Sequence, residues 1–198
     1  KEVFTPRQET EVMVEEAIAL AMSKYGGNCI LGDIGTGSGA IAIAMAHNID
    51  NCHIYATDLS PYSIHLANSN VREHNLPHKI TVLRGPLMAP IKEPLDIVVA
   101  NLPYIASGDI PSLDPEVRFH DPMMALDGGL DGLSLIQTLI TQLPMKLRPG
   151  GVCFLEIDPA QFDTVANNFK RQFPNAIIRP ILDLTHRIRI ISMETIPS

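Results

Sequence analysis

The sequence predicts a single α/β domain over residues 1–198, built on a doubly wound, mostly parallel sheet of about seven strands. Apolar runs typical of buried strands alternate along the chain with segments whose apolar residues recur at helical spacing. A glycine-rich turn at residues 33–39 follows the first of these runs and leads directly into a helical segment. The composition, 45% hydrophobic and 19% charged over 198 residues, suits one core of this kind.

The first half of the chain begins with a predicted helix over residues 9–24, which Gly26 and Gly27 end. Ser60 is a predicted N-cap, and Pro61 after it suits the first position of a helix that runs towards His74. Between these two helices we expect a strand at 29–35, a helix entered from the glycine turn within 35–48 and a strand at 53–58.

The second half continues the alternation around a long proline- and glycine-rich segment at residues 102–132. The last two β-rich runs follow one another closely, so we expect them to add an antiparallel edge to the parallel sheet. The predicted elements are strands at 80–83, 95–100 and 151–157, helices at 133–143 and 159–173, and the final strands at 177–182 and 187–193.

Composition excludes several classes of protein. The formal net charge is -7, from 15 basic and 22 acidic side chains, so a nucleic-acid partner is not expected. No apolar stretch approaches the ~20 residues that span a bilayer, and no secretory leader opens the chain. The three isolated cysteines fit a reducing compartment. We therefore expect a cytoplasmic protein without a membrane partner, acting on a protein or a small molecule.

No metal site is expected. The seven histidines show no spacing typical of metal ligands. Residues 127–132 resemble the start of a calcium loop, but Gly129 occupies its third position and Thr138 its twelfth, where carboxylates are needed.

The residues that follow each predicted strand are candidate site residues, because open α/β sheets bind ligands at the carboxyl ends of their strands. Gly35, Gly37 and Gly39 allow the backbone to turn sharply and to approach a ligand, while the helix behind them presents free N–H groups. Asp58 ends the second strand, where its carboxylate is placed to accept hydrogen bonds from ribose hydroxyls.

The identity of the ligand depends on Asp33, which directly precedes the glycines. Its negative charge suits the cationic sulfonium and amino group of S-adenosylmethionine better than a pyrophosphate. A nicotinamide dinucleotide stays open as an alternative, because Gly35, Gly37 and Ala40 also satisfy the looser dinucleotide fingerprint.

A second candidate site follows the strand at 95–100, with the sequence Asn101-Leu102-Pro103-Tyr104. An amide nitrogen is a poor nucleophile because its lone pair is delocalised, so methylating it requires two acceptors aimed at its two hydrogens. The side-chain oxygen of Asn101 and the carbonyl of Leu102 suit these roles. Pro103 would stiffen the turn, and Tyr104 would pack on the planar substrate group.

Several motifs in order resemble the HemK-type protein N5-glutamine methyltransferases along almost the whole chain. The family modifies the glutamine of the Gly-Gly-Gln motif in peptide chain release factors, so the resemblance implies a class I, Rossmann-like fold, S-adenosyl-L-methionine as cofactor and a release factor as partner. The matching segments are FTPRQETE (residues 4–11), DIGTGSGAIAIA (33–44), ATDLSPYSIHLANSN (56–70), VVANLPYI (98–105) and ALDGGLDGL (125–133).

The sequence also departs from the family pattern. Leu102 stands where the family usually has proline, and NLPY is also similar to the loop of ribosomal RNA adenine dimethyltransferases. Pro86 stands where the family has an acid near the adenine. Further departures are Asp121-Pro122-Met123 in place of Glu-Pro-Arg and residues 158–162 (DPAQF) in place of Gly-x-x-Gln-Gly. The family's small N-terminal helical domain is expected to be absent from residues 1–198.

The sequence thus predicts an enzyme that methylates a protein glutamine side chain. The alternatives are an adenine N6-methyltransferase acting on nucleic acid and a degenerate, non-catalytic domain that binds a translation factor. The predicted catalytic residues are Asn101, Leu102, Pro103 and Tyr104, and the predicted cofactor-binding residues are Thr10, Asp33, Gly35, Thr36, Gly37, Gly39, Asp58, Leu59, Pro86, Leu87 and Asn101.

Overall fold

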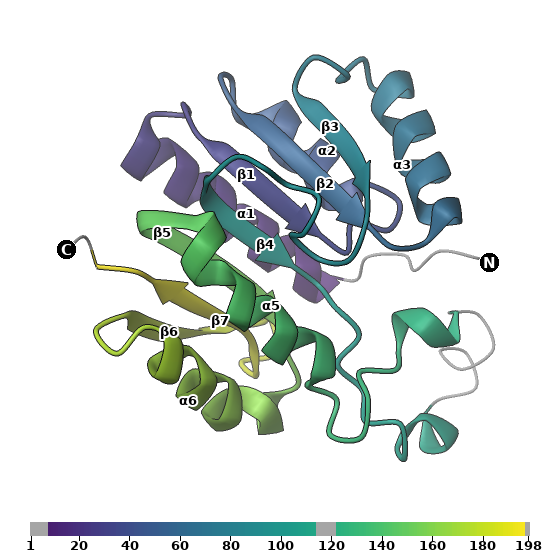
Figure 1. The fold of residues 1–198 in the computed structure, drawn as a ribbon, viewed down its shortest axis with the longest axis vertical. Coiled ribbons are helices and arrows are strands. Elements are labelled where there is room, and N and C mark those ends of the chain that lie inside the picture. Colours follow the sequence, from purple (N-terminus) through teal and green to yellow (C-terminus); the bar gives the residue numbers. More distant parts are fainter. Residues whose placement is uncertain (1–7, 114–121, 197–198) are drawn as a thin grey trace.

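A seven-stranded sheet in the order β3-β2-β1-β4-β5-β7-β6 organises the computed structural model, which describes residues 8–113 and 122–196 (Figure 1). The strands from β3 to β5 run parallel, while β7 is antiparallel to both β5 and β6. The strands are β1 (Ile30–Ile34), β2 (His53–Asp58), β3 (Ile80–Arg84), β4 (Leu95–Ala100), β5 (Leu147–Glu156), β6 (Ile177–Leu182) and β7 (Ile188–Glu194). The helices are α1 (Gln8–Tyr25), α2 (Ala40–Asn48), α3 (Pro61–Glu73), α5 (Ser134–Lys146) and α6 (Phe162–Gln172), with 3₁₀ turns at Ile110–Ser112, Met123–Ala125 and Pro159–Gln161.

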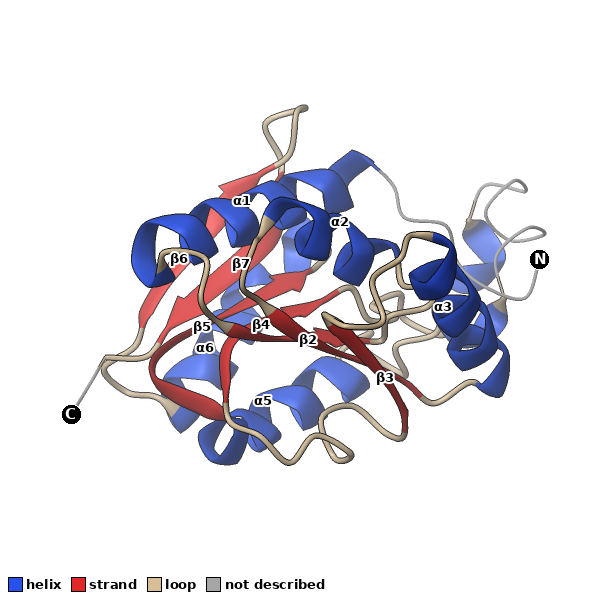
Figure 2. Ribbon diagram, turned by 90° about the horizontal axis from the view of Figure 1, so that it is seen from above, coloured by secondary structure: helices blue, strands red, loops and turns tan. Residues whose placement is uncertain are grey.

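Helices cover both faces of the sheet, as the alternating pattern predicts. Figure 2 shows α1 and α2 on one side of the strands and α5 and α6 on the other. Two core clusters correspond to these two layers, one between the sheet and α1 to α3, the other between the sheet and α5 and α6. The doubly wound arrangement is confirmed.

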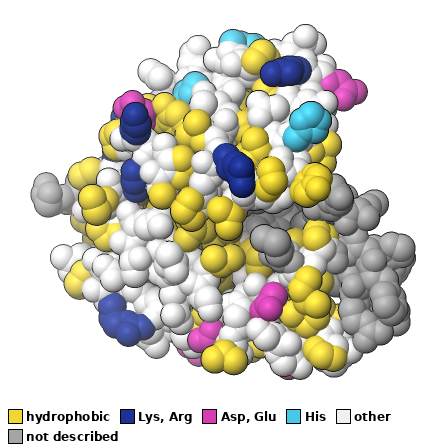
Figure 3. Space-filling view, turned by 45° about the vertical axis from the view of Figure 1, so that its right-hand side comes forward, with side chains coloured by type: hydrophobic (Ala, Val, Ile, Leu, Met, Phe, Trp, Pro, Cys, Tyr) yellow, Lys and Arg dark blue, Asp and Glu magenta, His cyan; other side chains and the backbone are white. Residues whose placement is uncertain are grey.

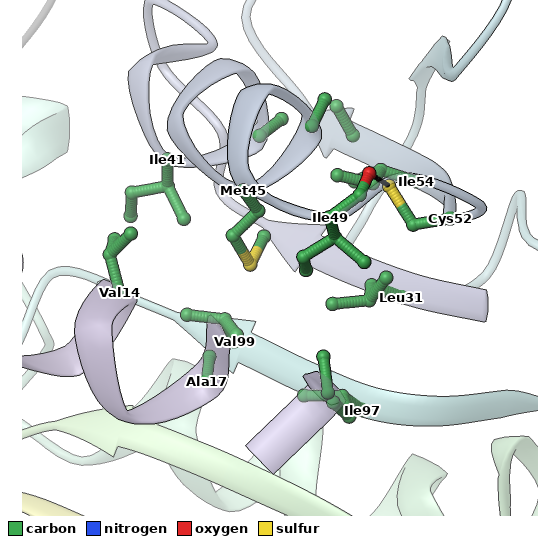
Figure 4. Packing of buried hydrophobic residues seen from close by; sticks show 14 of the residues in the cluster. Val14, Ala17, Leu31, Ile41, Met45, Ile49, Cys52, Ile54, Ile97 and Val99 are labelled. Atoms are coloured by element: carbon green, nitrogen blue, oxygen red, sulfur yellow. Dashed lines mark hydrogen bonds between the residues drawn. The ribbon is translucent and has the colours of Figure 1, made fainter. Parts of the chain in front are cut away.

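The first core cluster shows why the opening helix packs where it does. Val14 and Ala17 of α1 point towards Ile41 and Met45 of α2 and towards the sheet, where Val99 lies (Figure 4). Residues of α1 that are three or four positions apart share one face of the helix, so its apolar positions meet the core together. This packing places the N-terminal end of α1 beside the carboxyl end of the sheet (Figure 1).

The boundaries differ from the predictions at two places. β5 begins at Leu147, four residues before the predicted strand, because Leu147 pairs with Leu95 across a register shift. The predicted helix at 159–173 is divided into a 3₁₀ turn and α6, since Asp158 caps the turn and Gln161 completes a capping box with it. The predicted antiparallel edge is present, with β7 lying between β5 and β6.

The topology brings the candidate site residues to one edge of the sheet. Strand order reverses between β1 and β4, and a crevice forms at such a switch point, outside the carboxyl ends of the strands. Gly35 follows β1, Asp58 ends β2, Asn101 follows β4 and Glu156 ends β5. Four separate parts of the sequence therefore converge there.

Within residues 8–113 and 122–196, no helix is long and apolar enough to cross a membrane. The same residues include no group of three or more metal-ligating side chains.

Candidate active site

A cavity of about 1100 Å³ opens at the carboxyl edge of the sheet. The loops after β1, β2, β3 and β4 line one part of it, and residues that follow β5 line another. Apolar side chains contribute much of the lining, and hydrophobic side chains gather around a hollow on this side of the molecule (Figure 3). A pocket of this size and character suits a cofactor together with part of a substrate.

The glycine loop after β1 is shaped by residues in the left-handed region. Gly35, Gly37 and Gly39 have φ values of 77°, 56° and 82°, which strongly favour glycine. The backbone amides of Gly35 and Thr36 both donate to the Thr57 carbonyl, so the loop is fixed to the end of β2. Gly35, Thr36 and Gly37 line the cavity as predicted.

Gly39 ends the glycine loop, and its contact with the cofactor stays a prediction. It is the N-cap of α2 and is not among the lining residues of the cavity. A Cβ at this position would lie 3.3 Å from the Cβ of Ala67, so Gly39 allows α2 and α3 to pack closely. Its role in the fold is helix packing.

Asp33 also lies outside the cavity lining, although the sequence suggested that its charge faces a cationic ligand. The side chain is fully buried, and its Oδ2 accepts hydrogen bonds from the Thr36 hydroxyl (2.6 Å) and the Ala42 amide (3.1 Å). Asp33 therefore fixes the glycine loop from beneath. Desolvation by burial raises the pKa of this carboxyl to about 6, although both hydrogen bonds oppose the rise.

Asp58 lies in the cavity wall, as predicted. Its Oδ2 accepts from the Gly37 amide (3.0 Å), and its Oδ1 accepts from the Ser60 amide (2.8 Å). Each carboxylate oxygen has a further lone pair, so the side chain can still accept hydrogen bonds from a ligand. Leu59 beside it is 56% exposed and also lines the cavity.

The loop after β3 completes this side of the cavity. Pro86 is exposed and Leu87 half-buried, and both residues line the cavity. Leu87 has a φ of 48°, an uncommon conformation for a residue with a branched side chain. The Asp58 carbonyl accepts from the Gly85 amide, which ties this loop to the end of β2.

The loop after β4 forms the opposite wall, and Asn101, Leu102, Pro103 and Tyr104 all line the cavity. The Leu102 side chain turns into the second core cluster and is only 4% exposed. A Cβ on Gly35 would lie 2.9 Å from Leu102 Cδ2, so the glycine loop and this loop are in direct contact. The Leu102 side chain therefore packs in the core, although the residue also lines the cavity.

Asn101 is held by a chain of hydrogen bonds that the sequence did not predict. Its Nδ2 donates to Thr10 Oγ1 (3.0 Å), and the Thr10 hydroxyl donates to Glu156 Oε2 (2.7 Å). Thr10 is 1% exposed and does not line the main cavity, so it supports Asn101 from behind. In the structure Thr10 contacts Asn101 and Glu156, and a contact of Thr10 with the cofactor stays a prediction.

Glu156 is the main residue that sequence reasoning missed. It is 3% exposed, reaches the cavity, and accepts a hydrogen bond from the Tyr104 hydroxyl (3.2 Å) through its Oε1. Desolvation raises the pKa of its carboxyl, and the hydrogen bonds from Thr10 and Tyr104 oppose that rise. An acid at the end of the apolar strand GVCFLEI was the available signal.

A second loop supports Tyr104 from outside. Gln161 Nε2 donates to the Tyr104 carbonyl (2.8 Å), and Gln161 Oε1 accepts from the Asp158 amide. The segment at 125–133 packs on the same loop, since a Cβ on Gly132 would clash with the Tyr104 carbonyl oxygen. Within the unmatched motif at 158–162, Gln161 thus has a definite structural role. Residues 4–7 of the N-terminal motif and Asp121 lie outside the described residues.

The cavity lining is strongly acidic among the residues that the structure describes. Its ionisable acids come from α1, from the ends of β2 and β5, and from the segments that follow β4 and β5, whereas Arg189 of β7 is the basic residue of the lining. The acids are Glu9, Asp58, Asp109, Asp131, Glu156 and Asp158.

Comparisons with known proteins agree with this geometry. Residues 10–112 match the family model described as Ribosomal protein L11 methyltransferase (PrmA). Over 190 residues the chain is 37% identical to the release factor glutamine methyltransferase of Gloeobacter violaceus, and over 198 residues it is 34% identical to that of Bacillus anthracis. The first alignment covers 96% of this chain and 66% of the relative, the second 98% and 69%.

A solved structure supports the same relationship. The release-factor-specific protein-(glutamine-N5) methyltransferase from Alicyclobacillus acidocaldarius is 27% identical, with a TM-score of 0.59 and full coverage of both chains. The fold is therefore that of a class I methyltransferase.

The curated relatives are longer than this chain, which spans 50% to 69% of their lengths. The two alignments nevertheless extend over 96% and 98% of this chain. The resemblance seen in the motifs is confirmed: this chain belongs to the release factor glutamine methyltransferase family.

Proposed function

We propose that the chain transfers a methyl group from S-adenosylmethionine to the side-chain amide nitrogen of a glutamine in a peptide chain release factor. The observation that carries this proposal is the orientation of Asn101. Its Nδ2 donates to Thr10, which leaves Oδ1 as the group available to a ligand in the cavity. A glutamine NH₂ needs an acceptor of this kind.

The roles proposed for the loop after β4 follow from the chemistry of an amide. Asn101 Oδ1 and the Leu102 carbonyl would each accept one hydrogen of the glutamine NH₂, directing its nitrogen towards the methyl group. Positive charge that develops on the nitrogen would be stabilised by these two oxygens. Tyr104 would pack on the planar amide. Because the methylated nitrogen is acidic, no dedicated strong base is needed.

The cofactor half of the proposal uses the other wall of the cavity. Asp58 would accept hydrogen bonds from the ribose hydroxyls, and the glycine loop would lie against the methionine part of the cofactor. The excess of acids in the lining favours a ligand with a sulfonium and an ammonium group. When bound, S-adenosylmethionine supplies an electrophilic methyl group.

The same electrostatics disfavour the adenine N6-methyltransferase alternative. A nucleic-acid substrate would bring phosphates towards a cavity lined by six acids and one arginine, on a chain of net charge -7. A protein substrate carries no such penalty.

We also propose that the enzyme acts with its release factor in the cytoplasm, and that residues 1–198 supply the catalytic domain. Three free, buried cysteines fit that compartment.

The test is a transfer assay with methyl-labelled S-adenosylmethionine and separate samples of a release factor and of structured RNA. We expect label in the release factor, at the glutamine of its Gly-Gly-Gln motif, as located by mass spectrometry of peptides. A release factor with that glutamine replaced by alanine is the matched control and should remain unlabelled. Label in the RNA, or in the control protein, would contradict the proposal.

A further inference from the structure

Asn101 and Tyr104 border the proposed position of the acceptor amide, and Glu156 connects them, to Asn101 through Thr10 and to Tyr104 directly. It ends β5, and each of its carboxylate oxygens accepts a hydrogen bond from one hydroxyl, Oε2 from Thr10 and Oε1 from Tyr104. Thr10 lies on α1, 146 residues away in sequence, and Tyr104 lies 52 residues away. With 3% of its surface exposed, Glu156 is a buried acid whose two oxygens are both used.

The direction of this hydrogen-bond chain is fixed by the chemistry of its members. An ionised carboxylate only accepts, so the single hydroxyl proton of Thr10 is committed to Glu156. Thr10 Oγ1 then has only lone pairs to offer to Asn101. Asn101 must therefore turn its NH₂ towards Thr10, at 3.0 Å, and its Oδ1 away.

From this chain we propose that Glu156 is a positioning residue which sets the polarity of Asn101, so that an oxygen and not an NH₂ group faces the acceptor amide. The proposal rests on the proposed function, because only a substrate that presents N–H groups requires this polarity. Through its second oxygen Glu156 also holds Tyr104, so one carboxylate aligns both Asn101 and Tyr104.

An amide in place of the carboxylate no longer fixes the direction of the chain, because it carries one acceptor oxygen and one donor NH₂. If residue 156 presents an NH₂ to Thr10, the Thr10 hydroxyl is released to donate to Asn101, and Asn101 then rotates to present its own NH₂ to the substrate. Two N–H groups would face each other in a buried site, which is unfavourable. Glu156→Gln preserves size and shape, so its effect reports on polarity and not on packing.

The kinetic test compares three variants with the full chain as it exists. Glu156→Gln and Thr10→Val are expected to lower kcat by about 100-fold, with the Kd for S-adenosylmethionine within twofold of the wild type. Thr10→Ser keeps the hydroxyl and should retain most of the wild-type kcat. Glu194→Gln, the same change on the neighbouring strand β7 and outside the cavity lining, is the matched control and should leave kcat unchanged.

A pH profile separates polarity from simple structural support. Desolvation raises the pKa of Glu156, Glu9 on α1 raises it further, and Arg189 on β7 lowers it. As the pH falls through this raised pKa, the protonated carboxyl loses its acceptor-only character, so wild-type kcat should decline. Glu156→Gln should lack this acidic limb at its lower, constant kcat.

A measurement without turnover decides the orientation directly. The side-chain NH₂ of Asn101, assigned by its loss in Asn101→Ala, should give different NMR shifts in Glu156→Gln and Thr10→Val than in the wild type. Unchanged Asn101 signals in both Glu156→Gln and Thr10→Val, or kcat values above half of the wild-type value in both variants, would overturn the proposal. If the wild type fails to methylate glutamine, the proposed function is wrong, and the NMR result still decides whether Glu156 orients Asn101.

Discussion

The two walls of the cavity are held in place by contacts that span very different separations in sequence. The cofactor wall is formed by the loops after β1, β2 and β3, and the acceptor wall by the loop after β4. In the cofactor wall, Thr36 reaches Asp33 over three residues and Gly37 reaches Asp58 over 21. In the acceptor wall, Asn101 reaches Thr10 over 91 residues, and Thr10 reaches Glu156 over 146. The cofactor wall is thus a local structure, while the acceptor wall depends on the whole sheet being assembled.

This difference separates the consequences of mutation. A change in the glycine loop of the proposed cofactor wall should affect cofactor binding first, because the hydrogen bonds that hold this loop are separate from those that hold Asn101. A wall assembled from distant elements determines where the acceptor nitrogen lies, so changes there should affect turnover while cofactor affinity is kept. The following variants test that separation.

The largest effect is expected for Asn101→Ala in the acceptor wall. Removing the acceptor for the glutamine NH₂ should lower kcat by roughly 100-fold, since the loss of one hydrogen bond to developing charge in the transition state lowers kcat by about this factor. Calorimetry should show nearly unchanged affinity for S-adenosylmethionine. Asn48→Ala, which removes an exposed asparagine at the end of α2, is the control. Near-normal methylation by Asn101→Ala would contradict the amide-orienting mechanism.

Asp58→Ala in the cofactor wall should weaken S-adenosylmethionine binding by at least about tenfold, because charged hydrogen bonds contribute ~1.5–3 kcal/mol each. The loss includes the support that Asp58 gives to the Gly37 amide. Asp50→Ala, an exposed acid outside the site, should bind normally. An unchanged dissociation constant with intact circular dichroism would remove Asp58 from the cofactor site.

Gly132→Ala should displace the acceptor wall from outside. A Cβ at this position would clash with the Tyr104 carbonyl, so we expect kcat to fall about tenfold while cofactor affinity is kept. Gly26→Ala is the matched control, because Gly26 also has a positive φ, of 58°, but open space around it. Both variants should lose about 1 kcal/mol of stability from backbone strain. Equal kcat values for the two variants would contradict the steric argument.

The smallest effect is expected for Pro86→Asp in the cofactor wall. Pro86 lines the cavity but has neither an amide hydrogen nor a polar side chain. Supplying one partner to the adenine amino group should tighten binding about fivefold, which corresponds to about 1 kcal/mol. Parallel titrations with S-adenosylmethionine and sinefungin check this, since both carry adenine. No gain for either ligand would show that Pro86 is not a defect in the adenine site.

The contrast between the walls also explains what the sequence could predict. The glycine turn, the acid that ends β2 and the NLPY segment are short patterns in which neighbouring residues determine one another, and all three lie at the cavity. Element types were predicted for the same reason, because strand and helix periodicity is local.

The features that the sequence did not reveal have a common physical origin. Asp33 and Gly39 lie in the predicted loop, but the Asp33 side chain is buried beneath it and Gly39 packs on Ala67 of α3. Glu156 and its bond to Thr10 could not be predicted, because nothing in either segment identifies a partner 146 residues away. The early start of β5 likewise depends on a partner strand, through Leu95.

The buried carboxyl of Asp33 has a consequence for how the fold responds to pH. Its pKa is about 6 in the folded protein and near 3.8 when unfolded, so between these values the folded chain holds a proton that the unfolded chain has released. By linkage, the contribution of Asp33 to the free energy of unfolding is highest below pH 4. It then falls as the pH rises through 6, by up to about 3 kcal/mol.

Denaturant titrations of the ligand-free protein at a series of pH values would show this slope, and Asp33→Asn should flatten it because no proton is then released. An equally steep slope in the variant would assign the effect to other groups. At neutral pH the ionised Asp33 therefore lowers the stability of the fold, and the same carboxylate fixes the glycine loop through Thr36 and Ala42. The chain gives up part of its folding free energy to hold that loop in shape.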